Sequence, residues 1–295
     1  MGATSLQVGR FKVQPLDATF GAVVTGLKLS ELDDETFAAL YRTWLDYALL
    51  IFPGQHLANA EQVAFARRFG AMEFDLAPIS NVRPDGSIVS DESKAAVKTL
   101  KGNEGWHQDS TYMPVQAKGA VFSAHVVPEE GGETGWCDMR AAYDALDDAT
   151  RAKIAPLKAY HSLHYSQAKI GYTPAPNEDG VYADYGMNVK EPPLRPLVKI
   201  HPETGRSMLA VGRHAYGVPG LAPADSEALL ASLIAFAAEP PRIYHHRWTP
   251  GDAVVWDNRA LMHRARPWDM TKPRVMYHSR IAGDPVAEFA APTLS

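Results

Sequence analysis

The sequence has little cysteine and no long apolar run. Cys137 is the single cysteine among 295 residues, which excludes an internal disulfide and favours a reducing compartment. The longest apolar runs, such as YALLIF, are far too short to cross a bilayer. The first residues, MGATSLQVGRFKV, lack the apolar segment of a signal peptide. We therefore expect a cytoplasmic protein that has no membrane as a partner.

An excess of positive charge is also lacking. The formal net charge is −5, and no run of Lys or Arg occurs. Proteins that bind nucleic acid are usually basic, so nucleic acid is not expected as a partner. Hydrophobic residues make up 46% and charged residues 21%, the usual balance of a globular protein with a large core. No repeat or low-complexity segment divides the chain, and we expect one domain over residues 1–295.

Short strands dominate the pattern, as the 22 glycines and 22 prolines spread along the chain indicate. Strands are predicted at 11–16, 48–54, 119–127, 241–248, 251–258 and 274–283, and two more around a Pro-Glu-Thr-Gly turn within 196–212. Helices are predicted at 30–47, 59–70, 140–157 and 223–239, with caps at Ser30, Asn59 and either Asp225 or Ser226. Residues 166–193, rich in Gly, Tyr and Pro, indicate a long active-site loop or lid. A mainly β fold with flanking helices follows, either a sandwich or a barrel.

The stretch GNEGWHQDSTY at 102–112 contains a possible metal site. His107 and Asp109 are two residues apart, so on an extended strand both side chains would point to one face. His263 follows the strand predicted at 251–258, as a jelly-roll metal site requires. Two histidines and one carboxylate occupy one face of octahedral Fe(II) and leave three positions open. A ligand pair at His161 and His164 is an alternative, although isolated pairs of this kind usually have other roles.

An anion site is predicted further along the chain. Strand alternation puts Arg274, Met276, His278 and Arg280 on one face of the strand predicted at 274–283. A guanidinium binds a carboxylate through two hydrogen bonds and stays charged when buried. The hydroxyl of Thr134 could supply another bond to the same carboxylate. A structural ion pair is the alternative for Arg274.

These motifs together resemble a known family. The ordered set of His107-x-Asp109, GGETGW, WDNRALMHRA and Arg274 is similar to the taurine dioxygenase and 2,4-dichlorophenoxyacetate dioxygenase family of Fe(II)- and 2-oxoglutarate-dependent oxygenases. The resemblance covers nearly the whole chain and implies a double-stranded β-helix, that is, a jelly-roll of the cupin kind. It implies that His107, Asp109 and His263 hold the iron. It also implies that Thr134 and Arg274 bind the distal carboxylate of 2-oxoglutarate.

Within the family, the segments CDMRAAYDAL and HPETGRSMLAVGRHA are most similar to dioxygenases of aryloxyalkanoates, including the (S)-phenoxypropionates. The resemblance then implies that O2 and 2-oxoglutarate serve to hydroxylate the carbon beside the ether oxygen. The hydroxylated product collapses to a phenol and a 2-oxo acid, while 2-oxoglutarate leaves as succinate and CO2. Relatives that halogenate have a small residue in place of the iron-binding carboxylate, so Asp109 favours hydroxylation.

One position departs from the taurine enzymes. His278 stands where they have the arginine that binds the substrate sulfonate. The resemblance to the phenoxyacetate enzymes implies that Asn103, Arg213 and His214 contact the substrate, and His278 and Tyr112 are further candidates. A solvated loop charge is the alternative for Arg213, and a place in the core is the alternative for Tyr112. Arg213 could pair with a substrate carboxylate at any working pH, whereas a histidine could do so only while protonated. A homo-oligomer is also expected.

Other functions remain open at this stage. A dioxygenase for alkyl sulfonates or sulfate esters would have the same iron ligands. A zinc hydrolase could use two histidines and a carboxylate, but would have no use for Thr134 and Arg274 as an oxo-acid anchor. A non-enzymatic binding module would be favoured by loss of a ligand, and all three ligands are present.

Overall fold

The largest sheet has eight strands and runs through the molecule in the computed structural model, which describes residues 5–172, 186 and 191–290. All its pairings are antiparallel except that of β3 with β4. Its strands in spatial order are β1 (Leu6–Val8), β2 (Phe11–Pro15), β3 (Ala22–Thr25), β4 (Leu49–Phe52), β14 (Ala253–Asp257), β6 (Gly119–Val126), β16 (Val275–Ile281) and β5 (Met72–Ser80). Strands from both ends of the chain share this sheet, as a single domain requires. The single-domain organisation itself stays a prediction.

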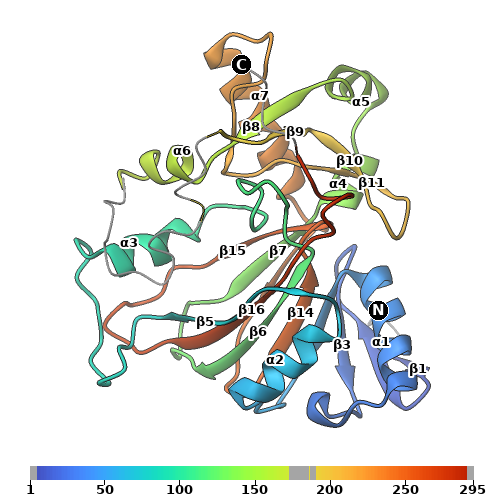
Figure 1. Ribbon diagram of the computed structural model, residues 1–295, viewed down its shortest axis with the longest axis vertical. Helices are drawn as coiled ribbons and strands as arrows, with labels where there is room; N and C mark the ends of the chain where they lie inside the picture. The colour runs from blue at the N-terminus through green and yellow to red at the C-terminus, as the bar shows by residue number, and fades with distance from the viewer. Residues whose placement is uncertain (1–4, 173–185, 187–190, 291–295) are drawn as a thin grey trace.

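A three-stranded sheet packs against the large one. It contains β13 (Ile243–His246), β7 (Thr134–Asp138) and β15 (Leu261–Ala265). Trp136 and Leu261 of this sheet meet Phe122, Trp256 and Met276 of the large sheet in one buried cluster. Figure 1 shows β7 and β15 beside β6, β14 and β16. Two sheets packed face to face in this way form the jelly-roll that the sequence predicts, and the mainly β prediction is confirmed.

Smaller sheets extend the β structure. One is β12 (Ala215–Tyr216), β8 (Lys158–His161) and β9 (Leu194–Pro196); the other is β10 (Val198–Ile200) with β11 (Ser207–Leu209). The turn between β10 and β11 contains the predicted Pro-Glu-Thr-Gly sequence. The helices are η1 (Leu29–Glu31), α1 (Asp34–Tyr47), α2 (Asn59–Arg67), α3 (Ala95–Gly102), α4 (Met139–Asp144), α5 (Asp148–Ile154), α6 (Leu163–Ala168) and α7 (Pro223–Ala237).

Helices cover the outer faces of both packed sheets. Trp44 of α1 and Phe65 of α2 are buried with Phe52 of the large sheet. Leu230 of α7 is buried with Met262 of β15 on the far side of the small sheet. Figure 1 shows α1 and α2 with the N-terminal strands at the bottom and α5 and α7 at the top. No helix among the described residues is long and apolar enough to cross a membrane.

The predicted N-terminal caps of three helices are wrong. Asp33, not Ser30, caps α1, because its carboxylate accepts a hydrogen bond from the N–H of Thr36 at 2.7 Å. Asn59 is the first residue of α2 and so is not its cap. Helix α7 begins at Pro223, upstream of both residues predicted to cap it, Asp225 and Ser226. Proline has the backbone angle that a first helical residue needs.

The helix predicted at 140–157 is in fact two helices, α4 and α5. The carboxylate of Asp147 accepts a hydrogen bond from the N–H of Thr150 at 2.7 Å and starts α5 anew. The N–H of Ala145 still bonds to the carbonyl of Ala141, so α4 ends normally before this break. Strand β5 and helix α3 were not predicted, and both prove to border the site described next.

Candidate metal centre and anion pocket

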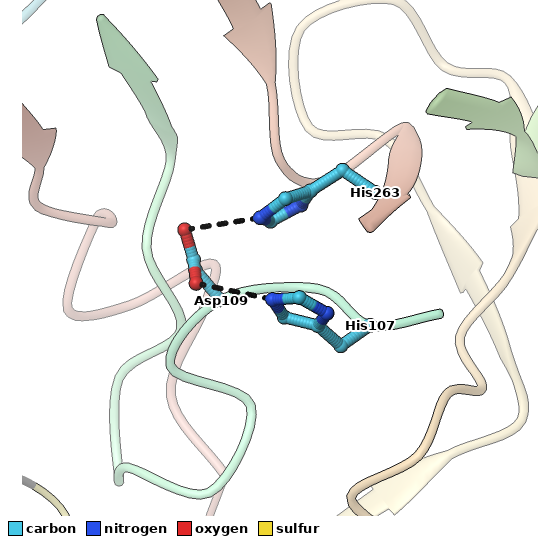
Figure 2. Close-up of side chains that lie close together, drawn as sticks. All are labelled: His107, Asp109 and His263. Atoms are coloured by element: carbon cyan, nitrogen blue, oxygen red, sulfur yellow. Dashed lines mark ion pairs between the residues drawn. The ribbon is translucent and has the colours of Figure 1, made fainter. Parts of the chain in front are cut away.

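His107, Asp109 and His263 converge, as the sequence predicts. Nε2 of His107 lies 3.9 Å from Oδ1 of Asp109, and Nε2 of His263 lies 3.7 Å from Oδ2. Figure 2 shows both imidazole rings facing the carboxylate. One ligand atom from each residue lies within 4.8 Å of the others. Since metal–ligand bonds of this kind are about 2 Å long, one ion could contact all three atoms.

Backbone pairing brings the two histidines together. His107 and His263 form an isolated antiparallel bridge, with N–O distances of 3.0 and 2.7 Å. Residues 107–109 do not form the extended strand that would put both side chains on one face, because only this bridge forms and a turn follows. The prediction for His263 also needs correction. The strand predicted at 251–258 is β14, and the chain turns back after it. His263 lies inside the next strand, β15, and not at the end of β14.

Asn258 orients Asp109 from that turn. Its side-chain oxygen accepts the N–H of Asp109 at 2.7 Å, and its amide nitrogen donates to the carbonyl of Asp109 at 2.9 Å. The same amide nitrogen donates to the carbonyl of Ala117 at 3.0 Å. A buried amide with these bonds holds the carboxylate on its side of the two histidines. Outer partners of this kind keep metal ligands in place.

The donor atoms fit a divalent metal ion. Nδ1 of His107 lies 2.7 Å from the carbonyl oxygen of Gly105, and a carbonyl can only accept, so Nδ1 has the proton. Nε2 of His107 consequently presents its lone pair towards Asp109. Oδ2 of Asp109 is a buried acceptor without a hydrogen-bond partner among the described residues. Two imidazole nitrogens and a carboxylate, with room for further ligands, suit Fe(II).

The protonation states also suit metal binding. Burial, followed by the charge of His263, lowers the pKa of His107 well below 6.5, and burial lowers the pKa of His263. Burial alone would raise the pKa of Asp109. Arg280, whose Nη2 lies 2.9 Å from Oδ1, and then the neighbouring histidines hold it below its usual range instead. Neutral imidazoles and an ionised carboxylate are the forms that ligate metals.

The alternative histidine pair does not form. His161 ends β8 and His164 lies in α6, so the two do not share a helix face. Within the described part of the chain, His107, Asp109 and His263 form the one group of three His, Cys, Asp or Glu residues arranged to hold an ion.

Arg274 and Thr134 line the same pocket as these three residues. Arg274 is 2% exposed, and its Nη2 donates to the carbonyl of Gly132 at 3.2 Å. Burial lowers the pKa of Arg274 to about 10, which leaves it charged. A structural ion pair was the alternative role for Arg274, but no carboxylate of the described residues pairs with its guanidinium. Thr134 Oγ1 accepts from Nε1 of Trp248 at 3.0 Å, so its own hydroxyl proton can be donated into the pocket.

The five residues predicted to contact the substrate all line this pocket; they are Asn103, Tyr112, Arg213, His214 and His278. Nη2 of Arg213 donates to the carbonyl of Ser166 at 3.0 Å and to Oε1 of Gln167 at 3.4 Å. Burial lowers the pKa of Arg213 to about 10. Its bonds within the described chain are to neutral groups, so the pocket contains a second guanidinium without a carboxylate beside it.

The two histidines of this set are neutral. Burial, followed by the charge of Arg213, lowers the pKa of His214 well below 6.5, and its Nδ1 lies 2.8 Å from Oγ of Ser166. Burial, followed by Arg280, lowers the pKa of His278 to about 3. Neither imidazole therefore supplies the positive charge that would pair with a substrate carboxylate. Arg213 is the better candidate of the three.

Several residues of the pocket were missed. Thr99 lies one turn before Asn103 on α3, and the buried Val97 and Leu100 of that segment were the signal for this helix. Gln167 belongs to α6, inside the segment predicted as a loop. Strand alternation had placed Arg280 on the face of Arg274 without giving it a role, and it proves to bond Asp109.

Most of the predicted active-site loop at 166–193, namely 173–185 and 187–190, lies outside the described residues. Its first three residues, 166–168, belong to α6 instead. Gly186, which the structure describes, lies against the ring of Tyr112: a Cβ at this glycine would be 2.2 Å from Cε2 of the ring. Of the described residues of this segment, Gln167 lines the pocket and Gly186 lies against Tyr112, which also lines it.

Comparisons with known proteins agree with this geometry. The model of a family described as "Taurine catabolism dioxygenase TauD, TfdA family" matches residues 12–280. The chain is 63% identical to an (S)-phenoxypropionate/alpha-ketoglutarate-dioxygenase of Sphingobium herbicidovorans, over 95% of this chain and 98% of that protein. It is 54% identical to an enzyme of the same name from Delftia acidovorans, over 95% of this chain and 98% of that protein. The crystal structure of AAD-2 in complex with Mn(II) and N-oxalylglycine is similar with a TM-score of 0.85 and 36% identity, covering 97% of this chain and 99% of that one.

Proposed function

The chain belongs to the TauD, TfdA family and is a 2-oxoglutarate-dependent dioxygenase, and we propose that its substrates are aryloxyalkanoic acids such as phenoxypropionates and phenoxyacetates. One observation supports this most directly. A single pocket is lined by His107, Asp109 and His263 together with two guanidinium groups that no carboxylate of the described residues pairs, those of the buried Arg274 and the half-buried Arg213. Such a pocket can accept a metal ion and two organic acids side by side. 2-Oxoglutarate, which is also called alpha-ketoglutarate, is one of these acids.

His107, Asp109 and His263 are the proposed ligands of Fe(II), and the complex of AAD-2 with Mn(II) supports a metal here. Fe(II), when bound, supplies the redox chemistry that couples oxidation of 2-oxoglutarate with O2 to hydroxylation of the substrate. Arg274 and Thr134 hold the distal carboxylate of 2-oxoglutarate, the first through its charge and the second through its hydroxyl proton.

Arg213 holds the carboxylate of the substrate. A carboxylate that enters a buried pocket must be paired there, and Arg213 offers a charge that no carboxylate of the described residues neutralises. Tyr112, whose ring meets that of His214 edge to face at 4.9 Å, forms an apolar wall for the aryl group. Asn103, His214 and His278 complete the proposed surroundings as neutral groups.

Held in this way, the substrate presents the carbon between its carboxylate and its ether oxygen to the metal centre. Hydroxylation of that carbon gives a hemiketal, or a hemiacetal from an acetate substrate. This product collapses without further oxidation. The bond from carbon to the ether oxygen breaks, the phenol leaves with a proton, and the carbon becomes the carbonyl of a 2-oxo acid. Each turnover also releases succinate and CO2.

A substrate panel tests this proposal. Both enantiomers of dichlorprop, 2,4-dichlorophenoxyacetate and taurine are supplied with Fe(II) and 2-oxoglutarate, and phenol, sulfite and succinate are measured. We expect phenol from at least one aryloxy acid. Sulfite from taurine with no phenol from any aryloxy acid would instead favour the alternative, a dioxygenase for alkyl sulfonates or sulfate esters. Membership of a dioxygenase family argues against the zinc hydrolase and the binding module.

Replacement of Arg213 by alanine tests its role separately. The KM for the aryloxy acid should rise, while the KM for 2-oxoglutarate should stay as it is, because Arg274 and Thr134 remain. A bond to a charged group contributes about 1.5–3 kcal/mol, so an increase of about 10- to 150-fold is expected. An unchanged KM for the aryloxy acid would remove Arg213 from the substrate site.

Two further properties stay proposals. A cytoplasmic location is supported by the single cysteine, Cys137, which is buried and free. A homo-oligomer is the expected assembly, and analytical ultracentrifugation would measure it directly.

A further inference from the structure

Two glycines lie directly beneath the side chain of Arg213. A Cβ placed on Gly102 would be 3.1 Å from Nη1 of Arg213 and 3.0 Å from Oε1 of Gln167. A Cβ placed on Gly105 would be 3.0 Å from Cδ of Arg213. All these separations are tighter than ordinary van der Waals contacts. An alanine at either position would therefore force the side chain of Arg213 to shift by a few tenths of an ångström.

Backbone conformation does not explain these glycines. Neither of them has a positive φ, so an alanine could adopt the same backbone. Gly102 is also the last residue of α3, a helical position that an alanine can occupy. The methyl group of an alanine at either position would instead crowd the side chain of Arg213.

The segment that supports Arg213 also orients a proposed metal ligand. The carbonyl of Gly105 accepts the Nδ1 proton of His107 at 2.7 Å, and the carbonyl of Trp106 accepts the N–H of Arg213 at 2.8 Å. Residues 102–107 thus contact Arg213 and hold His107 within one short stretch of chain. The distance from the guanidinium to the metal centre depends on this stretch.

From these contacts we propose that Gly102 and Gly105 are specificity-determining residues, which set how far the guanidinium of Arg213 stands from the metal centre. The proposal rests on the role of Arg213 in the proposed function. A substrate held by its carboxylate presents one carbon at a fixed distance from that carboxylate. The position of Arg213 therefore decides whether this carbon reaches the metal.

A second cavity adjoins Arg213 and gives it room to move. It is lined by Tyr165, Ile170, Leu230, Ala231 and Ile234 of the α6 and α7 region, as well as by Arg213 and both glycines. A methyl group at position 102 can thus displace the guanidinium without unfolding α3. The displaced Arg213 would still be charged but would hold the substrate in another place.

The test is Gly102→Ala, read by phenol and succinate measured in the same reaction. A misplaced substrate lets 2-oxoglutarate be consumed without hydroxylation, so phenol released per succinate should fall by about three- to tenfold. The KM for the aryloxypropionate should rise, the KM for 2-oxoglutarate should not change, and the Tm should not fall. A merely structural defect would lower phenol and succinate together. Lys101→Ala is the matched control, since Lys101 precedes Gly102 on α3 and pairs with Glu92 at 2.7 Å, away from Arg213, and it should change neither value.

A double mutant isolates the contact. In an Arg213→Ala background, Gly102→Ala should have little further effect on the KM for the aryloxypropionate, because the displaced guanidinium is gone. Gly105→Ala provides a second variant with the same expected loss of phenol per succinate, should Gly102→Ala fold poorly. If both glycine variants keep the wild-type ratio and KM while Arg213→Ala raises the KM, the specificity role is wrong and the proposed function stands. If Arg213→Ala leaves that KM unchanged, the assignment of Arg213 itself fails.

Discussion

Arg274 can be tested as the anchor of 2-oxoglutarate by a change that keeps its charge. Arg274→Lys loses the planar fork, which binds a carboxylate through two parallel hydrogen bonds. The loss of one bond to a charged group, about 1.5–3 kcal/mol, corresponds to a rise of about 10- to 150-fold in the KM for 2-oxoglutarate. The assay is succinate release at saturating aryloxy acid over a range of 2-oxoglutarate concentrations. The KM for the aryloxy acid should change little.

Stability distinguishes an anchor from a structural residue. Arg274 is buried, and among the described residues its guanidinium donates one hydrogen bond, to the carbonyl of Gly132, so the folded protein gains little from its charge when no acid is bound. Arg274→Met should therefore be as stable as the wild type, or more so, without 2-oxoglutarate. A ligand at 100 times its Kd stabilises a protein by about 2.7 kcal/mol. In the Mn(II)-loaded wild type 2-oxoglutarate should raise the Tm accordingly, and in Arg274→Met it should not.

Arg195 offers the matched control. It is as buried as Arg274, but it donates to the carbonyl oxygens of Thr111, Met113 and Glu288 at 2.7–3.1 Å. Arg195→Met should therefore lower the Tm and leave the KM for 2-oxoglutarate as it is, because those carbonyls lose their donor. If Arg274→Met instead lost stability as Arg195→Met does, and Arg274→Lys kept the wild-type KM for 2-oxoglutarate, the anchor assignment would be refuted.

Three further predictions concern the metal centre and the core. His263→Ala should abolish turnover and weaken Fe(II) binding while the circular dichroism spectrum is kept; undiminished iron affinity would contradict its role as a ligand. Asn258→Ala should weaken metal affinity by about 10- to 100-fold, because Asp109 loses both bonds that orient it; a titration with wild-type affinity would show that Asn258 is not needed. Burial, followed by the charges of Arg195 and Lys199, lowers the pKa of His161 to about 3. Between pH 6.5 and 3 the imidazole therefore binds a proton in the unfolded chain but not in the folded chain, so the free energy of unfolding falls as the pH falls. Between pH 7 and pH 5, the free energy of unfolding measured with urea should fall by about 2 kcal/mol less in His161→Leu than in the wild type. Equal falls in the two proteins would refute this.

The sequence by itself determined which residues enter the site. His107, Asp109 and His263 could be chosen because few residue types ligate Fe(II) and their order resembles a known family. Arg274 and Thr134 followed from the chemistry of carboxylate binding. Alternation along the last strand correctly placed His278 and Arg280 on the face of Arg274, since neighbouring positions of a strand point to opposite sides. A mainly β fold and about half of the described strands were likewise predictable from short-range pattern, whereas the jelly-roll was implied by the resemblance to the family.

Local pattern failed where a distant partner decides the outcome. The stretch at 107–109 is no strand, because its one pairing partner, His263, comes from β15. The predicted helix at 140–157 breaks where Asp147 forms a new cap. Helix α3 was missed although Val97 and Leu100 indicated it, and strand β5 was missed because none of its residues is fully buried and its pairing with β16 defines it.

Only the tertiary structure decided how the chosen residues are arranged and charged. Asn258 orients Asp109 although the two residues are distant in the sequence. The neutral state of His214 follows from its burial beside Arg213. The tight space at Gly102 and Gly105 is invisible in sequence, because the atoms that fill it belong to Arg213. Hydrogen bonds, desolvation and steric exclusion act over a few ångströms in space, whatever the separation along the chain, and so these properties depend on the fold.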